Sequence, residues 1–206
     1  MEYRKLGRTD IEVSAVAMGC WALAGGPTWG PQEESDSIAT IRAALDVGVT
    51  FFDTAEGYGA GESERVLGEA LAGRRHEAVI ATKVSRANLS GAEVQRACER
   101  SLKFLQTDYI DLYQIHWPSR TVPLEETMAA LVRLQEQGKV RAIGVCNFGV
   151  GDLDDLFEVE WVETNQVPYS LLWRAIEYEI QPKCVEKGMG LLCYSPLVLG
   201  LLTGKF

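Results

Sequence analysis

The sequence lacks long apolar runs and an excess of basic residues. No segment approaches the roughly 20 apolar residues of a membrane-spanning helix, and the opening MEYRKLGRTD lacks the apolar core of a signal peptide. The chain carries 20 basic and 29 acidic residues, a net charge of −9. Nucleic acid and anionic membranes bind basic surfaces, so we expect neither of them as a partner.

Paired cysteines and histidine clusters are also missing. The five cysteines are odd in number, scattered, and form no CxxC motif; they are Cys20, Cys98, Cys146, Cys184 and Cys193. This usage predicts reduced thiols in a cytoplasmic protein. Of the two histidines, His116 ends a predicted strand while His76 precedes another, so the two fall at opposite strand ends. We therefore expect no metal site.

What the sequence contains is a regular alternation of strand-like and helix-like segments. Apolar, β-rich runs occupy residues 15–20, 49–54, 78–84, 109–116, 140–146, 162–167 and 190–195. Segments with helical periodicity lie between them, for example at 34–48, 63–73, 90–106 and 123–138. Ser90, three residues before Glu93, has the pattern of a helix N-cap. The alternation predicts repeated βα units.

Two folds are built from such units, the open doubly wound sheet and the closed (β/α)8 barrel. A nucleotide-binding doubly wound sheet has a glycine-rich turn after its first strand, but MGCWALAGG at 18–26 does not fit that pattern. Polar residues instead follow the carboxyl ends of many strands. This distribution favours an α/β fold of the (β/α)8 TIM-barrel type.

The count of elements falls short of a complete barrel. After an N-terminal hairpin at 5–14, we expect seven strands and six helices in a single barrel domain covering 1–206. The seventh helix, eighth strand and eighth helix have no sequence left to form them, so the chain is expected to be C-terminally truncated. Its two open sheet edges could pair with another copy.

The predicted strand ends bring together several polar side chains. They are Asp53, Lys83, His116, Asn147, Gln166 and Tyr194, with Tyr58 in the loop that follows Asp53. In a barrel all these ends open on one mouth, where the active site lies. Taken singly, Asp53 could cap a turn and His116 could be a satisfied core histidine. Their shared position at strand ends favours the joint interpretation as a site.

The predicted chemistry is proton delivery. A tyrosine is a poor acid at neutral pH, and a nearby cation lowers its pKa. Lys83 is the candidate cation, and Asp53 could hold it through a charge-assisted hydrogen bond. Tyr58 would then act as a general acid toward a substrate oxygen, with His116 as a second donor.

The same residues lie in a series of motifs that strongly resembles the aldo-keto reductases, NADPH-dependent (β/α)8-barrel oxidoreductases. The motifs are FFDTAEGYG, IATKV, YIDLYQIHWP, VRAIGVCNF, NQVPYSLLWR and YSPLVLGLLTGK, in this order over nearly the whole chain. The resemblance implies that Asp53, Tyr58, Lys83 and His116 form a catalytic tetrad. It further implies reduction of an aldehyde or ketone, with Tyr58 as proton donor tuned by Lys83 and Asp53, and His116 orienting the carbonyl.

The resemblance also implies sites for the cofactor and the substrate. The cofactor-binding residues would be Cys20, Trp21, Asp53, Asn147, Gln166, Tyr194, Ser195, Leu197 and Gly200. The amides of Asn147 and Gln166 would hold the nicotinamide carboxamide, and Tyr194 would stack on its ring. Trp21, Trp29, Tyr58 and Trp117 would line the substrate pocket. One departure from the family pattern is Cys146, which stands where a serine is usual.

Two alternatives to an active reductase stay open from the sequence. The family includes non-catalytic, channel-associated subunits, so the barrel could bind a cofactor and serve a regulatory role. The chain could also be an inactive fragment. Retention of all four tetrad residues favours catalysis, whereas the short C-terminal part favours the alternatives.

Overall fold

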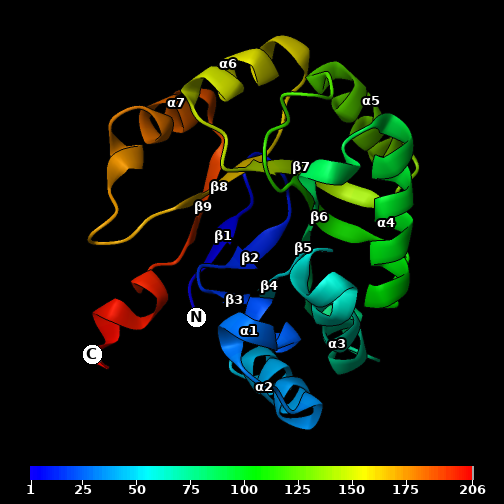
Figure 1. Cartoon of the computed structure of the whole chain (residues 1–206), viewed down its shortest axis with the longest axis vertical. Coiled ribbons are helices and arrows are strands. Elements are labelled where there is room, and N and C mark those ends of the chain that lie inside the picture. The colour runs from blue at the N-terminus through cyan, green and yellow to red at the C-terminus, as the bar shows by residue number, and fades with distance from the viewer. Residues whose placement is uncertain (206) are drawn as a thin grey trace.

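Seven parallel strands form one curled sheet in the computed structural model, which describes residues 1–205 (Figure 1). The strands lie side by side in sequence order: β3 (Ala17–Gly19), β4 (Phe51–Asp53), β5 (Val79–Val84), β6 (Ile110–Ile115), β7 (Val140–Cys146), β8 (Thr164–Pro168) and β9 (Gly190–Tyr194). This order confirms the predicted barrel-type architecture with seven strands.

A helix follows each of the first six strands of the sheet and packs on its outer side (Figure 1). These are α2 (Glu34–Asp46), α3 (Glu62–Ala70), α4 (Gly91–Leu105), α5 (Leu124–Glu136), α6 (Val150–Val159) and α7 (Ile180–Lys187). The one-turn helix α1 (Gly26–Trp29) lies in the loop after β3. Within the described part of the chain, no helix combines the length and the apolar character that crossing a bilayer requires.

The central strands are buried on both faces, which explains their almost continuous apolar sequences. Ile80 and Val84 of β5 point outward into the large core shared with the helices. Ala81, on the alternate face, belongs to a smaller cluster inside the curl of the sheet. Lys83 is on that same inner face by the two-residue period of a strand.

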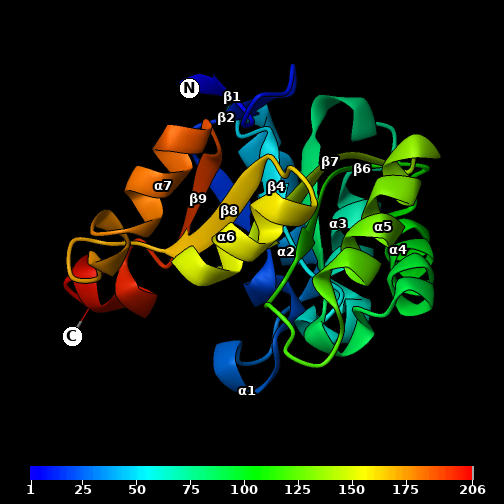
Figure 2. The same ribbon diagram turned by 90° about the horizontal axis from the view of Figure 1, so that it is seen from above.

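The N-terminal hairpin closes one end of this interior. Its strands β1 (Tyr3–Lys5) and β2 (Glu12–Ser14) pair antiparallel, at the end of the sheet opposite to α1 (Figure 2). Leu6 and Ile11 from the hairpin segment pack with Leu112 in the inner cluster. The Ser14 hydroxyl accepts hydrogen bonds from the N–H groups at the start of β4. The open end is therefore the one at which the parallel strands finish.

The two strands at the ends of the sheet order, β3 and β9, differ from the central ones. β3 has no buried residue, and β9 is only partly buried. By contrast every residue of β6 is buried. Burial thus decreases from the middle of the sheet toward both edges.

Candidate active site

The carboxyl ends of the strands bring the four predicted tetrad residues together. Asp53 is the last residue of β4, Lys83 is the penultimate residue of β5, and His116 directly follows β6. Tyr58 begins the short 3-10 helix that follows β4. Because these strands are adjacent and parallel, their ends lie at the same rim of the sheet.

Lys83 is at the centre of the group. Its side chain is completely buried, and its Nζ donates to Asp53 Oδ1 at 2.6 Å and to the carbonyl oxygen of Thr54 at 2.7 Å. Nζ also lies 3.5 Å from the Tyr58 hydroxyl. Burial by itself lowers the pKa of Lys83, but Asp53 together with Tyr58 and Cys146 outweighs this effect, so the pKa lies above its ordinary value. Lys83 is therefore a protonated cation at neutral pH.

Tyr58 does not have the lowered pKa that the sequence analysis expected. Burial raises the pKa of the phenol, and this effect is larger than the lowering caused by Lys83. In the structure the Tyr58 hydroxyl is therefore a neutral group that holds its proton. The expectation considered the cation alone and omitted desolvation, which acts in the opposite direction.

The turn that holds Tyr58 depends on glycine. Gly59 and Gly61 have φ angles of +62° and +96°. A Cβ atom on Gly61 would come within 2.5 Å of the Phe104 ring, and one on Gly59 within 2.7 Å of the Ala24 side chain. A larger residue at either position would therefore displace the turn that carries Tyr58.

His116 lies beside Tyr58, with their ring centroids 5.8 Å apart in an edge-to-face arrangement. Burial, assisted by the nearby charge of Lys83, lowers the pKa of His116 to about 4. The imidazole is therefore neutral near pH 7 and has a single N–H to donate. This protonation state is suited to orienting a carbonyl oxygen by a hydrogen bond.

Gln166 joins the tetrad directly. Its Nε2 donates to Asp53 Oδ2 at 2.8 Å, so each carboxylate oxygen of Asp53 has one partner. The amide oxygen of Gln166 faces only the Cys146 thiol, at 3.9 Å. Because a thiol is a weak donor, this amide oxygen remains available to a stronger one.

Asn147 connects His116 with Tyr194. It has a φ of +63°, a conformation that asparagine tolerates better than most residues. Its Nδ2 donates to the carbonyl oxygen of His116 at 3.0 Å, and its Oδ1 accepts from the Tyr194 hydroxyl at 2.9 Å. Both atoms of this amide are thus already engaged within the protein.

The predicted pocket aromatics form a continuous series of ring contacts. Trp29 meets Trp21 edge-on at 5.5 Å, and Trp21 stacks on Tyr58 at 5.9 Å. On the other side, Trp117 stacks on His116 at 6.5 Å. All three tryptophans are more than one-third exposed. The structure therefore places apolar, accessible rings on both sides of the Tyr58 and His116 pair.

The remaining predicted cofactor residues follow the two edge strands, β3 and β9. Cys20 is fully buried, its thiol contacts the carbonyl oxygen of Met18, and its backbone N–H donates to the carbonyl oxygen of Asp53 at 2.8 Å. Ser195 and Leu197 follow β9, and Gly200 lies in the final 3-10 segment. Among residues 1–205, their side chains make no hydrogen bond to the tetrad.

The sequence analysis overlooked a second set of polar residues behind the tetrad, namely Ser63 and Glu64 of α3 and Thr82 of β5. All three are buried. One signal was available in the sequence: Glu64 shares a helix face with Leu67 and Leu71, which are three and seven residues further on and are both buried. A carboxylate on an apolar helix face indicates a specific role.

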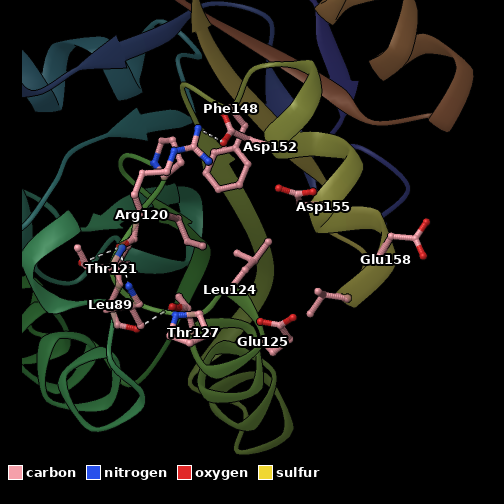
Figure 3. Close-up of a pocket in the computed structure, with 16 residues that line it drawn as sticks. Leu89, Arg120, Thr121, Leu124, Glu125, Thr127, Phe148, Asp152, Asp155 and Glu158 are labelled. Atoms are coloured by element: carbon pink, nitrogen blue, oxygen red, sulfur yellow. Dashed lines mark hydrogen bonds and ion pairs between the residues drawn. The ribbon is translucent and has the colours of Figure 1, made fainter.

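A groove lies elsewhere, on the outer side of the sheet (Figure 3). It has a volume of about 570 Å³ and lies between α6 and the loop that leads into α5. Arg120 reaches across it to Asp152, while Asp155 and Glu158 lie along α6. None of the four tetrad residues lines this groove. Across residues 1–205, no three His, Cys, Asp or Glu side chains form a group that could hold a metal ion.

Comparison with known proteins identifies the family. The sequence model of the aldo/keto reductase family matches residues 15–206, nearly the entire chain. The chain belongs to the aldo/keto reductase family. The curled parallel sheet with outer helices is thus the fold of this family, in agreement with the expectation from the sequence.

Two curated aldo/keto reductases illustrate the relationship. The chain is 43% identical over 215 residues to the aldo-keto reductase YhdN of Bacillus subtilis, covering all of this chain and 65% of that protein. It is 39% identical over 191 residues to the methylglyoxal reductase YeaE of Escherichia coli, covering 91% of this chain and 66% of that protein. The chain therefore spans just under two thirds of the length of each.

Solved structures of aldo/keto reductases superpose closely. A thermostable aldo-keto reductase in complex with the inhibitor epalrestat matches with a TM-score of 0.92 and 36% identity, over 100% of this chain and 76% of that one. An aldo/keto reductase from Klebsiella pneumoniae in complex with NADP and acetate matches with a TM-score of 0.86 and 36% identity. That match covers 94% of this chain and 68% of the Klebsiella chain.

Proposed function

We propose that this protein reduces a small aldehyde or ketone to an alcohol with NADPH, and that residues 1–206 act as one barrel-type unit. The observation that carries the proposal is the buried Lys83 cation, which contacts both Asp53 and Tyr58. A fully buried lysine is rare, and here it lies next to an ionisable hydroxyl at the open end of the sheet. The names of the related aldo-keto and methylglyoxal reductases support the same reaction class.

The residues present fit a nicotinamide cofactor. Among residues 1–205, the amide oxygen of Gln166 has only the weak thiol donor of Cys146 as a hydrogen-bond partner. Tyr194, whose hydroxyl donates to Asn147, is partly exposed. After β9, Val198 and Leu199 have φ angles of +50° and +52°, a strained conformation for such side chains. Such strain is frequent at ligand-binding segments. When bound, the nicotinamide supplies the hydride that reduces the carbonyl carbon.

The side chains of this chain deliver the proton. Tyr58 breaks its O–H bond and gives the proton to the carbonyl oxygen, as the C=O double bond becomes a C–O single bond. Lys83 stabilises the negative charge left on the phenol oxygen, and Asp53 keeps Lys83 in place. His116 donates its N–H to the same carbonyl oxygen and fixes its direction. Solvent then returns a proton to Tyr58.

The aromatic series provides the substrate pocket in this proposal. Trp21 and Trp117 flank the Tyr58 and His116 pair, and their exposed rings present apolar surface to a bound carbonyl compound. A substrate with a small apolar or aromatic group next to its carbonyl would suit these walls.

Replacement of Tyr58 by phenylalanine tests the proposal. Tyr58→Phe removes the proton donor and leaves the ring contacts with Trp21 and His116, so we expect kcat for carbonyl reduction to fall by about 10³-fold or more. The rate is followed by NADPH absorbance with a panel of aliphatic and aromatic aldehydes and ketones. A Tyr58→Phe variant that reduces carbonyls at the wild-type rate would disprove the role of Tyr58.

Cofactor binding is measured separately from turnover. Titration with NADPH, followed by the fluorescence of the five tryptophans, is expected to show saturable binding by both wild-type and Tyr58→Phe protein. Binding without turnover of any carbonyl in the panel would instead support a non-catalytic, cofactor-binding barrel.

A further inference from the structure

The first turn of α3 extends behind the tetrad and carries two buried polar residues. Ser63 and Glu64 are fully buried, whereas Glu62, the first residue of the same helix, has a partly exposed side chain. They follow the turn that holds Tyr58 by only a few residues. The chemistry proposed above gives neither of them a role.

Ser63 is linked to Lys83 through one residue. Its hydroxyl donates to the carbonyl oxygen of Cys20 at 2.7 Å and lies 2.8 Å from the Thr54 hydroxyl. Thr54 in turn accepts from Lys83 Nζ through its carbonyl oxygen. Ser63 thereby connects α3 with the end of β4 at the residue that holds the lysine.

Glu64 makes a parallel connection to β5. Its Oε1 accepts a hydrogen bond from the Thr82 hydroxyl at 2.6 Å. Thr82 directly precedes Lys83, and successive side chains of a strand point to opposite faces. Glu64 therefore holds β5 from the helix side at the position where Lys83 enters the site from the inner side.

We propose that Glu64 is a positioning residue for the carbonyl reduction: it anchors Lys83 through Thr82, and its protonation sets how strongly Lys83 acts on Tyr58. This inference rests on the proposed function for its catalytic consequence. The electrostatic effect of Glu64 on Tyr58 does not require a substrate and can be measured in the free protein.

The surroundings of Glu64 favour the protonated acid. Its second oxygen, Oε2, is buried and has no hydrogen-bond partner among residues 1–205. An ionised carboxylate with an unpartnered buried oxygen is unfavourable, whereas a carboxylic acid carries its proton there. Burial accordingly raises the pKa of Glu64 to about 7.

Other polar groups also act on the pKa of Glu64, each less strongly than burial. The hydroxyl groups of Thr82 and Ser101 lower the pKa of Glu64, Glu56 raises it, and Lys83 lowers it. Cys98 and Tyr113 also face the carboxyl, and both stay neutral because burial raises their pKa values. Lys83 is the cation among these groups.

The direction of the effect on catalysis follows from charge. Ionised Glu64 opposes the field of Lys83, so the negative charge that forms on the Tyr58 oxygen during proton release is less stabilised. Protonation of Glu64 removes this opposition. We therefore expect kcat for reduction to be larger below pH 7 than above it, by about fivefold.

The first experiment compares the pH dependence of kcat and KM in three proteins. Wild type should lose kcat as pH rises through about 7, with KM little changed, because the effect acts on the proton transfer. Glu64→Gln keeps the acceptor oxygen for Thr82 but cannot ionise, so its kcat should lack this step. Glu69→Gln is the matched control on the exposed side of α3 and should keep the wild-type profile. A step that persists unchanged in Glu64→Gln would overturn the proposal.

The anchoring part is tested at Thr82, independently of any charge change. Thr82→Val removes the hydroxyl that donates to Glu64, and kcat should fall about tenfold at constant KM. Thr82→Ser keeps the hydroxyl and should restore most of the rate. If the serine variant is impaired as severely as the valine variant, the hydrogen bond to Glu64 does not position Lys83.

A measurement without substrate separates this inference from the proposed function. The pKa of Tyr58 can be read from the ¹³Cζ NMR signal of labelled tyrosine, assigned with Tyr58→Phe. At the high pH where Tyr58 ionises, Glu64 carries a negative charge, and Glu64→Gln removes it. The pKa of Tyr58 should therefore fall by about half a unit in this variant. An unchanged Tyr58 pKa overturns the coupling. A lowered pKa in a protein that reduces no carbonyl supports the coupling and refutes the proposed function alone.

Discussion

The two halves of the sheet differ in how completely their side chains are buried. In the half from β4 to β7, the strands are almost completely buried and the polar atoms of Lys83 and Asp53 all have partners. In the half formed by the loop before β9, β9 itself and the segment after it, the strand is partly exposed and apolar side chains such as Leu172, Leu197 and Leu199 face outward. The first half holds the proposed proton-delivery group, and the second holds four of the predicted cofactor residues, Tyr194, Ser195, Leu197 and Gly200.

This difference separates two requirements of the proposed reaction. Proton delivery needs fixed distances between Lys83, Asp53 and Tyr58, and close packing around a buried cation provides them before any ligand arrives. Cofactor binding needs accessible surface and backbone that can meet a large molecule. The edge strand and the strained segment after it offer these features, at the expense of local packing.

The largest expected effect comes from removing one leucine from each half. Leu112 is fully buried in the inner cluster, whereas Leu172 in the loop after β8 is 64% exposed. Leu112→Ala should lower the free energy of unfolding by about 3 kcal/mol, because it leaves a cavity. Leu172→Ala should change it by less than about 0.5 kcal/mol. Urea unfolding measures both, and equal losses would mean that the two halves are equally packed.

The second prediction concerns pH and the buried half alone. The pKa of Glu64 is raised from its ordinary value of 4.5 to about 7, so its stabilising contribution is complete below pH 4.5 and is lost as pH rises through 7. The pKa of His116 is lowered from 6.5 to about 4, so its contribution is complete above pH 6.5 and is lost as pH falls through 4. The two contributions oppose each other between pH 4.5 and 6.5.

Two variants make these opposing contributions visible. The Glu64→Gln protein should itself lose about 2 kcal/mol of stability between pH 7.5 and pH 4.5, because only the His116 contribution remains in it. His116→Gln should show the reverse trend by a similar amount of about 2 kcal/mol. Urea unfolding at the two pH values gives both numbers. Parallel pH profiles for the two variants would contradict the assigned protonation states.

The smallest effect is expected at the junction between the halves. Tyr194→Phe removes the hydroxyl that donates to Asn147 Oδ1 at 2.9 Å and leaves the ring in place. Because Tyr194 is partly exposed, water can replace the lost partner, and the cost in unfolding free energy should be about 0.5 kcal/mol. Thermal or urea unfolding checks this value. A loss above 2 kcal/mol would show that the exposed half is held as firmly as the buried one.

Much of the fold could be predicted from the sequence, because its signals are local. Strand β7 coincides with the predicted range 140–146, and α4 differs from 90–106 by one residue at each end. Buried parallel strands have continuous apolar runs, and such runs are recognisable without knowledge of their neighbours. The expected helix start at Ser90 was also correct.

The interactions that complete these elements were not predictable in the same way. Ser90 makes no side-chain cap, and the first N–H of α4 instead donates to Glu126 Oε1 from α5 at 2.7 Å. Glu56 accepts hydrogen bonds from the Ser85 N–H and the Asn88 side chain and is mostly buried, although its place in the sequence does not indicate either. Both contacts join residues about thirty positions apart, which no local pattern encodes.

The sequence by itself determined the family, the order of strands and helices, and the identities of the four residues proposed to transfer the proton. These depend on residue type and spacing along the chain. Only the tertiary structure decided their protonation states. The pKa of Tyr58 is raised because burial outweighs the effect of Lys83, and the pKa of His116 is lowered because burial and Lys83 act in the same direction. It also revealed Glu64 behind Lys83, since desolvation and side-chain contacts arise only when distant segments pack together.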